Sequence, residues 1–473
     1  MNDFETTLQN IEAAISGWLT DYIMVTLLLV AAVWFTLRLR FAQVTMLGSM
    51  LRTLVQSGSG HRKGSVSSFQ AFALSIASRV GTGNLAGVAT AIVVGGPGAV
   101  FWMWVIAILG AASAFVECTL AQLFKVRAAD GTFAGGPAYY IQKGLGQRWW
   151  AVLFAVLITL TFGLAFNSVQ SNTMSAALNT AFGIPEAGTA VVLAVLTGLA
   201  ICGGVHRIGR ISQWVVPFMA IGYIVLAIVI VCMNIHRLPD VMTLIVENAF
   251  GVNQALGGTM GAAMIMGVKR GLFSNEAGEG STPNAAAVAD VSHPVKQGLL
   301  QTLGVYVDTL LICTATAMVI LCSGVSIGGQ YDGIELTQRA VDASLGGSLG
   351  SVFVGIAIVL FAFTSIIANY YYGETNLRFI NRGRGRVMIG VYRLVVVLIV
   401  YAGALTSLGV VWGFADITMA LMTVCNLVAI VMLGRYAVAL LRDYRRQQRE
   451  GKDPQYHRGT LPSIKDETEC WPD

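Results

Sequence analysis

The sequence contains few charged residues. Only 12% of its 473 residues are Asp, Glu, Lys or Arg, whereas 55% are hydrophobic, and its mean hydropathy is +0.68. A soluble protein of this length needs a larger charged fraction to cover its surface with groups that interact well with water. The composition therefore excludes an ordinary soluble protein and predicts a chain embedded in a lipid bilayer.

The sequence also lacks the usual signals of metal binding, disulfide bonding and catalysis. Its seven cysteines include no CxxC spacing, and its five histidines lie in or near predicted loops without an HExxH pattern. We therefore expect no disulfide framework, no metal site and no cofactor apart from a coupling ion. No nucleophile stands with a base inside the apolar segments, so an enzyme is not expected. A channel would need a carbonyl filter such as TVGYG, which is missing.

Long apolar segments dominate the chain. A membrane-spanning helix needs about 20 mostly apolar residues, and eleven segments satisfy this requirement. Long runs of this kind predict an all-α polytopic membrane protein, because a barrel would show short alternating strands. The predicted spans are 17–37, 67–95, 99–124, 149–181, 186–204, 211–233, 255–290, 295–323, 348–377, 387–407 and 411–434.

Lys and Arg lie mostly in the loops of one side. That side holds the cluster at 378–386 and the basic tail "RDYRRQQREGK", whereas the other side has only Arg237 and Arg339. Cytoplasmic loops carry such an excess, so we expect an outside N-terminus and a cytoplasmic C-terminus. The clusters are interpreted as orientation signals and not as nucleic-acid sites. The sequence does not indicate an oligomeric state.

The ten spans after the first divide into two sets of five with the same plan. Each set opens with an apolar segment interrupted by glycine and polar residues, "RVGTGNLAG" in one and "LFSNEAGEGSTPN" in the other. Because five is odd, the second set enters from the opposite side, which is the inverted 5+5 repeat of many secondary transporters. The expected units are a periplasmic N-terminus at 1–16, an extra first helix and basic loop at 17–66, the repeats at 67–233 and 255–434, and a basic cytoplasmic tail at 435–473.

The first interrupted segment carries groups suited to a substrate and a cation. Unwinding a helix inside a membrane exposes backbone groups, which persist only where a cavity or ligand supplies partners. The freed N–H groups near Thr82, Gly83 and Asn84 suit a carboxylate. The freed carbonyls near Ala77 and Val80 suit a cation such as Na⁺. The alternative is that the glycines only allow tight helix packing.

A second group of oxygens lies in the ninth segment, "FAFTSIIAN". The Phe361 carbonyl and the hydroxyls of Thr364 and Ser365 share one helix face at i, i+3 and i+4. With Ala77 and Val80 they would complete a five-oxygen sodium shell. Alternatively, the two hydroxyls bond back to their own helix, as Ser and Thr often do in membranes.

Two further polar features lie within the spans. Asn167 and Gln170 form a stripe that either contacts substrate or joins helices. A charge at the bilayer centre is costly and should be paired or face water. We consider a structural bridge between Arg79 and a carboxylate such as Glu276 or Glu279, and an outer gate in which Asp416 pairs with Lys269 or Arg270. The intramembrane charges are Arg79, Glu117, Lys269, Arg270, Glu276, Glu279 and Asp308.

Three long motifs resemble those of the alanine or glycine:cation symporter family. They are "GGPGAVFWMWVIAILG" at 95–110, "SRVGTGNLAGVA" and "GLFSNEAGEGSTPNAAA", in the family's order. The resemblance implies a LeuT-like fold preceded by one extra helix, in a bacterial inner membrane. It also implies import of alanine, glycine or a similar small amino acid, coupled to Na⁺ or, in some members, to H⁺, by alternating access. The alternative is an H⁺-coupled or exchange transporter of another small amino acid or solute.

The resemblance also implies roles for particular residues. By analogy with the fold, Thr82 and Gly83 would bind the substrate carboxylate, and a second sodium site would use Asn84. Glu279 departs from the family pattern, which has an apolar residue such as methionine there. The rest of the substrate would be surrounded by Gln170, Phe273, Ser274 and Asn275, and the sodium site would use Ala77, Val80, Phe361, Thr364 and Ser365.

Overall fold

The computed structural model describes residues 17–57, 65–128, 131–202, 204–251, 259–382 and 385–473. The predicted N-terminus at 1–16 and the predicted start of the second repeat at 255 lie outside these residues. The described chain is helical, with one short antiparallel pair of strands, β1 and β2.

The first half of the chain runs from the extra helix to the end of the first predicted repeat. In order, its elements are η1 Gly17–Met24, α2 Val25–Arg38, α3 Ala42–Thr45, α4 Leu47–Gln56, α5 Ser68–Arg79, η2 Gly83–Gly87, α6 Val88–Gly95, α7 Ala99–Leu123, β1 Val126–Arg127, β2 Phe133–Ala134, α8 Pro137–Leu145, α9 Arg148–Leu160, η3 Thr161–Phe166, α10 Asn167–Phe182, α11 Glu186–Ile201 and α12 Gly204–Met233.

The second half contains the second predicted repeat and the C-terminal segment. Its elements are η4 Ile235–Arg237, α13 Leu238–Ala249, α14 Met260–Asn275, α15 Pro283–Ala286, α16 Pro294–Val305, η6 Tyr306–Cys313, α17 Thr314–Ser323, α18 Gly333–Leu345, α19 Leu349–Ile380, α20 Arg386–Leu405, α21 Leu408–Arg449, η7 Arg458–Thr460 and η8 Pro462–Glu467.

Eight helices of the described chain are long and apolar enough to cross a membrane. The count of eleven spans stays a prediction, because the helices of the remaining three segments are each shorter than 18 residues. Gly83–Gly95 and Glu186–Ile201 are apolar but shorter than 18 residues, and α14 has 16 residues. A chain that breaks helices at mid-membrane does not give every span the full length of about 20 residues.

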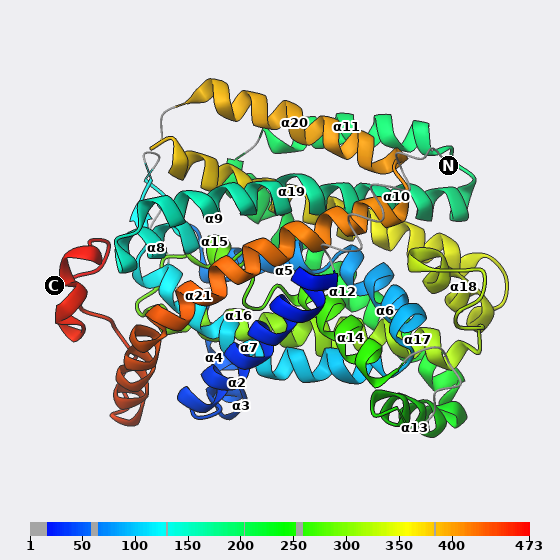
Figure 1. Cartoon of the computed structure of the whole chain (residues 1–473), viewed down its shortest axis with the longest axis horizontal. Helices are drawn as coiled ribbons and strands as arrows, with labels where there is room; N and C mark the ends of the chain where they lie inside the picture. Colours follow the sequence, from blue (N-terminus) through cyan, green and yellow to red (C-terminus); the bar gives the residue numbers. More distant parts are fainter. Residues whose placement is uncertain (1–16, 58–64, 129–130, 203, 252–258, 383–384) are drawn as a thin grey trace.

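Corresponding helices of the two halves pack against each other. Helix α7 lies against α16, α10 against α19, and α11 against α20. In Figure 1, α9, α10, α11, α19 and α20 form one layer, while α5, α6, α7, α14 and α16 form another, and α21 crosses obliquely between them. Pairing of like elements is the arrangement expected from two copies of one five-helix plan.

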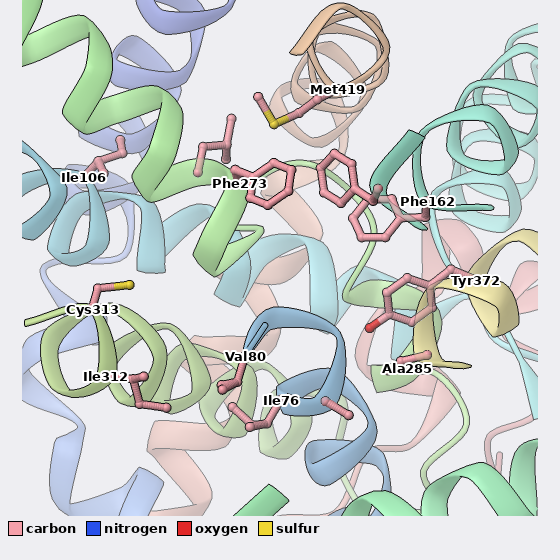
Figure 2. Packing of buried hydrophobic residues seen from close by; sticks show 14 of the residues in the cluster. Ile76, Val80, Ile106, Phe162, Phe273, Ala285, Ile312, Cys313, Tyr372 and Met419 are labelled. Carbon is pink, nitrogen blue, oxygen red and sulfur yellow. The ribbon is translucent and has the colours of Figure 1, made fainter. Parts of the chain in front are cut away.

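An aromatic cluster fills the space between the two layers. The ring of Phe273 on α14 lies 4.3 Å from that of Phe166 and 4.5 Å from that of Trp412, and Phe162 continues the cluster 4.5 Å from Phe166. Figure 2 shows Phe273 and Phe162 within this packing, with Met419 above and Val80 below. Such ring pairs contribute about 0.5–1.5 kcal/mol each beyond the area they bury, so the cluster fixes α14 relative to η3 and α21.

The C-terminal segment packs against the ends of membrane helices. Helix α21 continues to Arg449, past residue 434, where the last predicted span ends. The chain then returns, and the Trp471 indole N–H donates to the carbonyls of Gln122 and Leu123 at 3.1 and 3.2 Å. These carbonyls are at the end of α7, where intrahelical donors run out, so the indole caps that helix.

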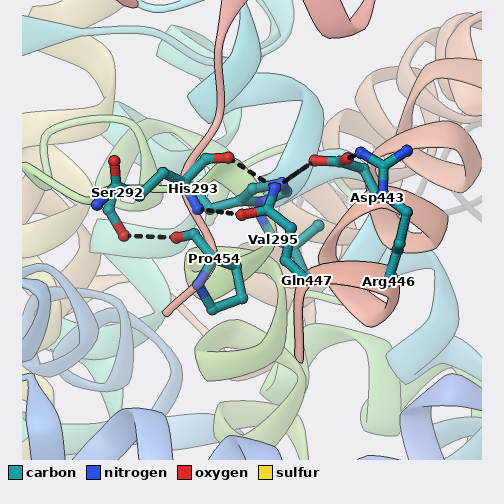
Figure 3. Close-up of polar contacts among 8 residues, drawn as sticks. Ser292, His293, Val295, Asp443, Arg446, Gln447 and Pro454 are labelled. Atoms are coloured by element: carbon teal, nitrogen blue, oxygen red, sulfur yellow. Dashed lines mark hydrogen bonds and ion pairs between the residues drawn. The ribbon is translucent and has the colours of Figure 1, made fainter. Parts of the chain in front are cut away.

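A histidine joins this segment to the start of α16. His293 Nδ1 accepts the N–H of Val295 at 3.2 Å and Nε2 lies 3.4 Å from Asp443 Oδ2, while Ser292 Oγ donates to the Pro454 carbonyl at 2.9 Å (Figure 3). His293 precedes the span that begins at Pro294. Burial lowers the pKa of the His293 imidazole below its ordinary value of 6.5, against the opposing effect of Asp443.

Candidate functional site

The first predicted break interrupts the helix after Arg79. Helix α5 begins with a capping box between Ser67 and Gln70, and ends where Val80 adopts an extended conformation with φ −79° and ψ 101°. The helix resumes at Gly83. The Gly81 N–H, which has lost its helical partner, donates to Asn84 Oδ1 at 2.9 Å. A side chain thus satisfies a freed backbone group, as a break inside a membrane requires.

The second predicted break follows α14. Glu276 has a φ of +57°. Gly278 and Gly280 have φ values of +92° and +86°, and glycine adopts such positive values without steric cost. The N–H groups of both glycines donate to the carboxylate of Glu117 on α7, each at 3.1 Å. Asn426 holds the same carboxylate at 2.8 Å. The sequence marks Glu117 as an intramembrane charge but does not indicate this role, because its partners lie more than 160 residues away.

The two breaks meet at residues predicted to bind substrate. Gln170 Oε1 on α10 accepts the backbone N–H of Thr82 at 3.0 Å and its hydroxyl at 2.8 Å. A Cβ placed on Gly83 would lie 3.0 Å from Ser274 Cα and 3.1 Å from the Phe273 ring. The absence of a side chain at Gly83 therefore lets the two broken helices approach each other closely.

Asn275 is oriented differently from the other predicted substrate residues. Its Nδ2 donates to Thr309 Oγ1 at 3.2 Å and its Oδ1 accepts the Ala277 N–H at 3.0 Å. The side chain thus closes the end of α14 and contacts η6. Asn167, of the predicted stripe, donates to the carbonyl of Gly163 in its own helix, so in this structure only Gln170 of the stripe contacts the break.

Residues of the predicted sodium set lie beside the first break. Ser365 Oγ on α19 is 3.2 Å from the Val80 carbonyl and 3.0 Å from the Phe361 carbonyl. Thr364 Oγ1 donates to the Phe361 carbonyl at 2.8 Å, which is the back-bonding alternative, and Ala77 lies fully buried in the last turn of α5. These hydroxyl and carbonyl oxygens are hard donors of the type that alkali cations prefer.

Asn84, predicted for a second ion site or a structural role, belongs to a network between the breaks. Its Nδ2 donates to Asp308 Oδ1 at 2.6 Å, and Asp308 Oδ2 accepts the hydroxyls of Ser274 at 2.8 Å and Thr309 at 2.9 Å. The position of Asp308 next to Asn84 was not predicted. The available signal was a single carboxylate in an otherwise apolar segment, which is costly without partners.

The charges predicted for the outer end form a buried group. Arg270 donates to both oxygens of Asp416, at 3.1 and 2.8 Å, and Lys269 lies 3.3 Å from Asp416 and 3.0 Å from Asp21. Both predicted partners of Asp416 are therefore in contact with it. The Arg270 guanidinium also lies 4.0 Å above the Trp412 ring, so the ion pairs border the aromatic cluster.

The predicted bridge between Arg79 and a carboxylate is wrong as a direct contact. Among the described residues Arg79 makes no ion pair, and it donates to the Gln301 carbonyl at 3.2 Å and to Thr282 Oγ1 at 3.0 Å. Thr282 in turn donates to Glu276 at 3.2 Å. The guanidinium and the carboxylate are thus connected through a hydroxyl, because the turn after Glu276 places Thr282 between them.

Comparison with known proteins assigns the chain to a family. Residues 5–458 match the model of the sodium:alanine symporter family. The chain is 49% identical to the probable sodium/glutamine symporter GlnT of Bacillus subtilis, covering 98% of this chain and 96% of that one. It is 48% identical to the amino-acid carrier protein AlsT of the same organism, covering 100% and 99%. It is 37% identical to the sodium/alanine symporter AgcS of Methanococcus maripaludis, covering 88% and 92%.

A solved structure supports the fold assignment. The structure resembles that of MhsT in complex with L-phenylalanine, with a TM-score of 0.53, 14% identity and coverage of 86% of this chain and 93% of that one. This likeness concerns the fold alone, which is LeuT-like. Together with the apolar helices, it describes a multi-pass membrane protein. The chain belongs to the sodium:alanine symporter family, whose members are transporters.

Proposed function

We propose that the protein imports small neutral amino acids, alanine or glycine, together with Na⁺, by alternating access. It acts in a bacterial inner membrane with its N-terminus in the periplasm and its C-terminus in the cytoplasm. The observation that carries the proposal is the junction at the first break, where the Thr82 N–H faces Gln170 and the Val80 carbonyl faces Ser365. A hydrogen-bond donor for a substrate carboxylate and an oxygen ligand for a cation thus lie next to each other.

The Thr82 N–H supports recognition of a carboxylate. It stands at the start of the helix that resumes at Gly83, where partial positive charge accumulates. In the present conformation Gln170 Oε1 takes the place of an anion, because it accepts both the N–H and the hydroxyl of Thr82. A substrate carboxylate would displace this amide oxygen, and the freed Gln170 would then turn toward the rest of the substrate.

Tight packing around Thr82 supports a small substrate. Thr82 and Ser274 are fully buried, and Phe273 is 4% exposed. The aromatic contacts of Phe273 with Phe166 and Trp412 close the space on one side. A larger side chain would require these rings to move, whereas one methyl group alters discrimination by only about 1–3 kcal/mol. Alanine and glycine therefore fit the proposal better than large amino acids.

Sodium is the proposed coupling ion. The carbonyl oxygens of Val80 and Phe361 lie 3.2 and 3.0 Å from Ser365 Oγ. A Na⁺ ion would take the Ser365 oxygen as a ligand instead of its present hydrogen bonds. Asp308, next to Asn84, offers a carboxylate for a second ion near the substrate position.

The names of relatives supply two alternatives. GlnT is described as a probable sodium/glutamine symporter, and a Bacillus relative that is 40% identical is described as a sodium/proton-dependent alanine carrier protein. Glutamine as substrate and H⁺ as driving ion are therefore the second candidates. An exchanger of small amino acids is a further alternative mechanism.

The test is uptake of labelled L-alanine into proteoliposomes containing the purified protein. A Na⁺ gradient and an equal H⁺ gradient are imposed in separate experiments, with excess glycine, D-alanine or L-glutamine as competitors. Concentrative uptake driven by Na⁺ and blocked by glycine supports the proposal. Uptake driven only by H⁺ contradicts the sodium site, strong competition by glutamine reassigns the substrate, and absence of uptake for all these amino acids contradicts the proposed function.

A pair of serine variants tests the sodium site itself. Ser365→Ala should raise the Na⁺ concentration needed for half-maximal uptake, because it removes one oxygen ligand. Ser344→Ala is the matched control, since Ser344 Oγ only donates back to the Ala340 carbonyl in its own helix. Unchanged Na⁺ activation in Ser365→Ala would remove this residue from the site.

A further inference from the structure

The loop between α14 and α15 contains a carboxyl group that the proposed transport site does not use. Glu279 is 0% exposed, and neither of its two oxygens has a hydrogen-bond partner among the described residues. An ionised carboxylate has only acceptor oxygens, and burying it without donors is so unfavourable that such groups take up a proton instead. The surroundings of Glu279 therefore favour the neutral acid.

Its two acidic neighbours, Glu117 and Glu276, are surrounded by hydrogen-bond donors, unlike Glu279. Glu117 accepts three hydrogen bonds, from the N–H groups of Gly278 and Gly280 and from Asn426. Glu276 also accepts three, from the hydroxyls of Ser78, Ser281 and Thr282 at 2.6, 2.5 and 3.2 Å. Donors directed at a carboxylate stabilise its charged form. Of the three carboxyl groups, only Glu279 lacks such donors.

The charge balance leads to the same conclusion. The charged groups that act on Glu279 are Arg79 on α5, Glu117 on α7 and Glu276 in the break itself. Were Glu117 and Glu276 both ionised, their two negative charges would already exceed the single positive charge of Arg79. A third ionised carboxyl group would add a second uncompensated negative charge in a region where all four side chains are buried, which is strongly disfavoured.

The ligand that fits Glu279 is a proton and not a metal ion. Within the part of the chain that the structure describes, no three His, Cys, Asp or Glu side chains are grouped to hold a metal ion. Moreover, the oxygens of Glu117 and Glu276 are already engaged by donors, and so cannot turn toward a shared cation. A proton needs only the one carboxyl group.

We propose that Glu279 is a proton-binding site, protonated in this conformation, and that it exchanges its proton with water when the α14–α15 break opens during transport. On opening, the O–H bond of the acid breaks, the proton passes to water on the open side, and the carboxylate that remains is stabilised by water and Arg79. On closing, a proton returns to the carboxylate as it is buried again. The exchange part of this proposal rests on the transport function proposed above, whereas the protonation part does not.

The protonation part is tested by infrared spectroscopy of the full-length protein in lipid at neutral pH. Wild type minus Glu279→Gln should show the carbonyl band of a buried protonated carboxyl group, shifted in D₂O. Wild type minus Glu335→Gln is the control, since Glu335 pairs with Arg339 on the exposed face of α18, and should lack the band. Glu279→Met is used if the Gln variant does not fold.

Two results would overturn the protonation part. One is a difference spectrum for Glu279→Gln without the carbonyl band. The other is a band that appears only when Na⁺ is replaced by choline, since this would make Glu279 a sodium ligand. Both results are independent of whether the protein transports any amino acid.

The exchange part is tested with a pH indicator trapped inside proteoliposomes. Adding the transported amino acid should move protons in wild type and in Glu335→Gln, and the ratio of protons to substrate should be lost in Glu279→Gln. An unchanged ratio in Glu279→Gln, or substrate uptake by wild type without proton movement, would overturn the exchange. If no amino acid is taken up by wild type, the proposed function fails while the infrared result still decides the protonation part.

Discussion

Substitution of Gly81 should impair both proposed sites at once. A Cβ at this position would lie 2.5 Å from Ser365 Oγ and 2.9 Å from Gln170 Oε1. Both side chains are buried, with 0% and 2% exposure, and so cannot swing into solvent. Extra methyl groups in a packed core cost about 1–3 kcal/mol. If this cost falls on the ligand-bound state, Gly81→Ala should weaken binding of amino acid and ion about 5- to 150-fold.

Gly87, at the end of η2, provides a matched control for this substitution. A Cβ on Gly87 would meet its nearest neighbour, Trp412, at 3.6 Å, which is ordinary contact. We expect Gly87→Ala to keep the wild-type KM, and Gly81→Ala to raise both the KM for amino acid and the Na⁺ concentration for half-maximal uptake in proteoliposomes. Wild-type values for both quantities in Gly81→Ala would refute the placement of Gly81 between the two sites.

A double variant separates steric from ligand effects. Gly81→Ala should also lower the Tm, because the new Cβ would lie 2.5 Å from the Ser365 hydroxyl. In Gly81→Ala/Ser365→Ala this hydroxyl is gone, so part of the lost Tm should return. Na⁺ activation should not return, because the same hydroxyl is a proposed ligand. Contacting residues are expected to show such non-additivity, and strictly additive effects of the two substitutions would show that the two positions do not interact.

Three further predictions concern other parts of the structure. Asp416→Asn should lower the stability of the protein by about 3–5 kcal/mol, seen as a lower Tm in detergent, because it leaves Arg270 without its buried counter-ion; an unchanged Tm would contradict the pairing. Because burial lowers the pKa of His293, the unfolded chain binds the proton more readily, so stability present above pH 6.5 should fall as the pH drops below that value. His293→Asn, which can still cap α16, should reduce this fall in thermal unfolding measured across pH, and an identical profile would argue against His293. Trp471→Ala should release the C-terminal segment, measured as faster proteolysis after Arg449, and wild-type cleavage would show that the indole does not hold it.

The breaks were predictable from the sequence because their cause is local. Glycines and polar residues inside an apolar segment conflict with a continuous membrane helix, and α5 and α14 end within those stretches. The i, i+3, i+4 spacing likewise placed the hydroxyls of Thr364 and Ser365 beside the Phe361 carbonyl on α19. The contact of Ser365 with the Val80 carbonyl agrees with the prediction that the free carbonyls of the interrupted helix and the hydroxyls of the ninth segment belong to one sodium site.

The partners of the buried charges were not predictable from the sequence. Arg79 was assigned a carboxylate, yet it donates to a backbone carbonyl at Gln301 and to the Thr282 hydroxyl. Such partners leave no signature, since every residue has a carbonyl and hydroxyls are common. Glu117 binds N–H groups of the second break, a contact set by the packing of α7 against α14. Spacing along one helix contains no information about this packing.

The geometry at Gly81 gives a physical route for coupling ion to substrate. The Val80 carbonyl and the Thr82 N–H belong to the two peptide groups on either side of Gly81, and they contact Ser365 and Gln170, respectively. An ion that draws the Val80 carbonyl toward α19 fixes one peptide group and so restricts the orientation of the next. The N–H that would bind a carboxylate is then already oriented, and less conformational entropy is lost when the substrate arrives. Because coupling free energy is reciprocal, a bound substrate must in turn hold the Val80 carbonyl in position for Na⁺. It must raise the affinity for Na⁺ by the same factor as Na⁺ raises the affinity for substrate.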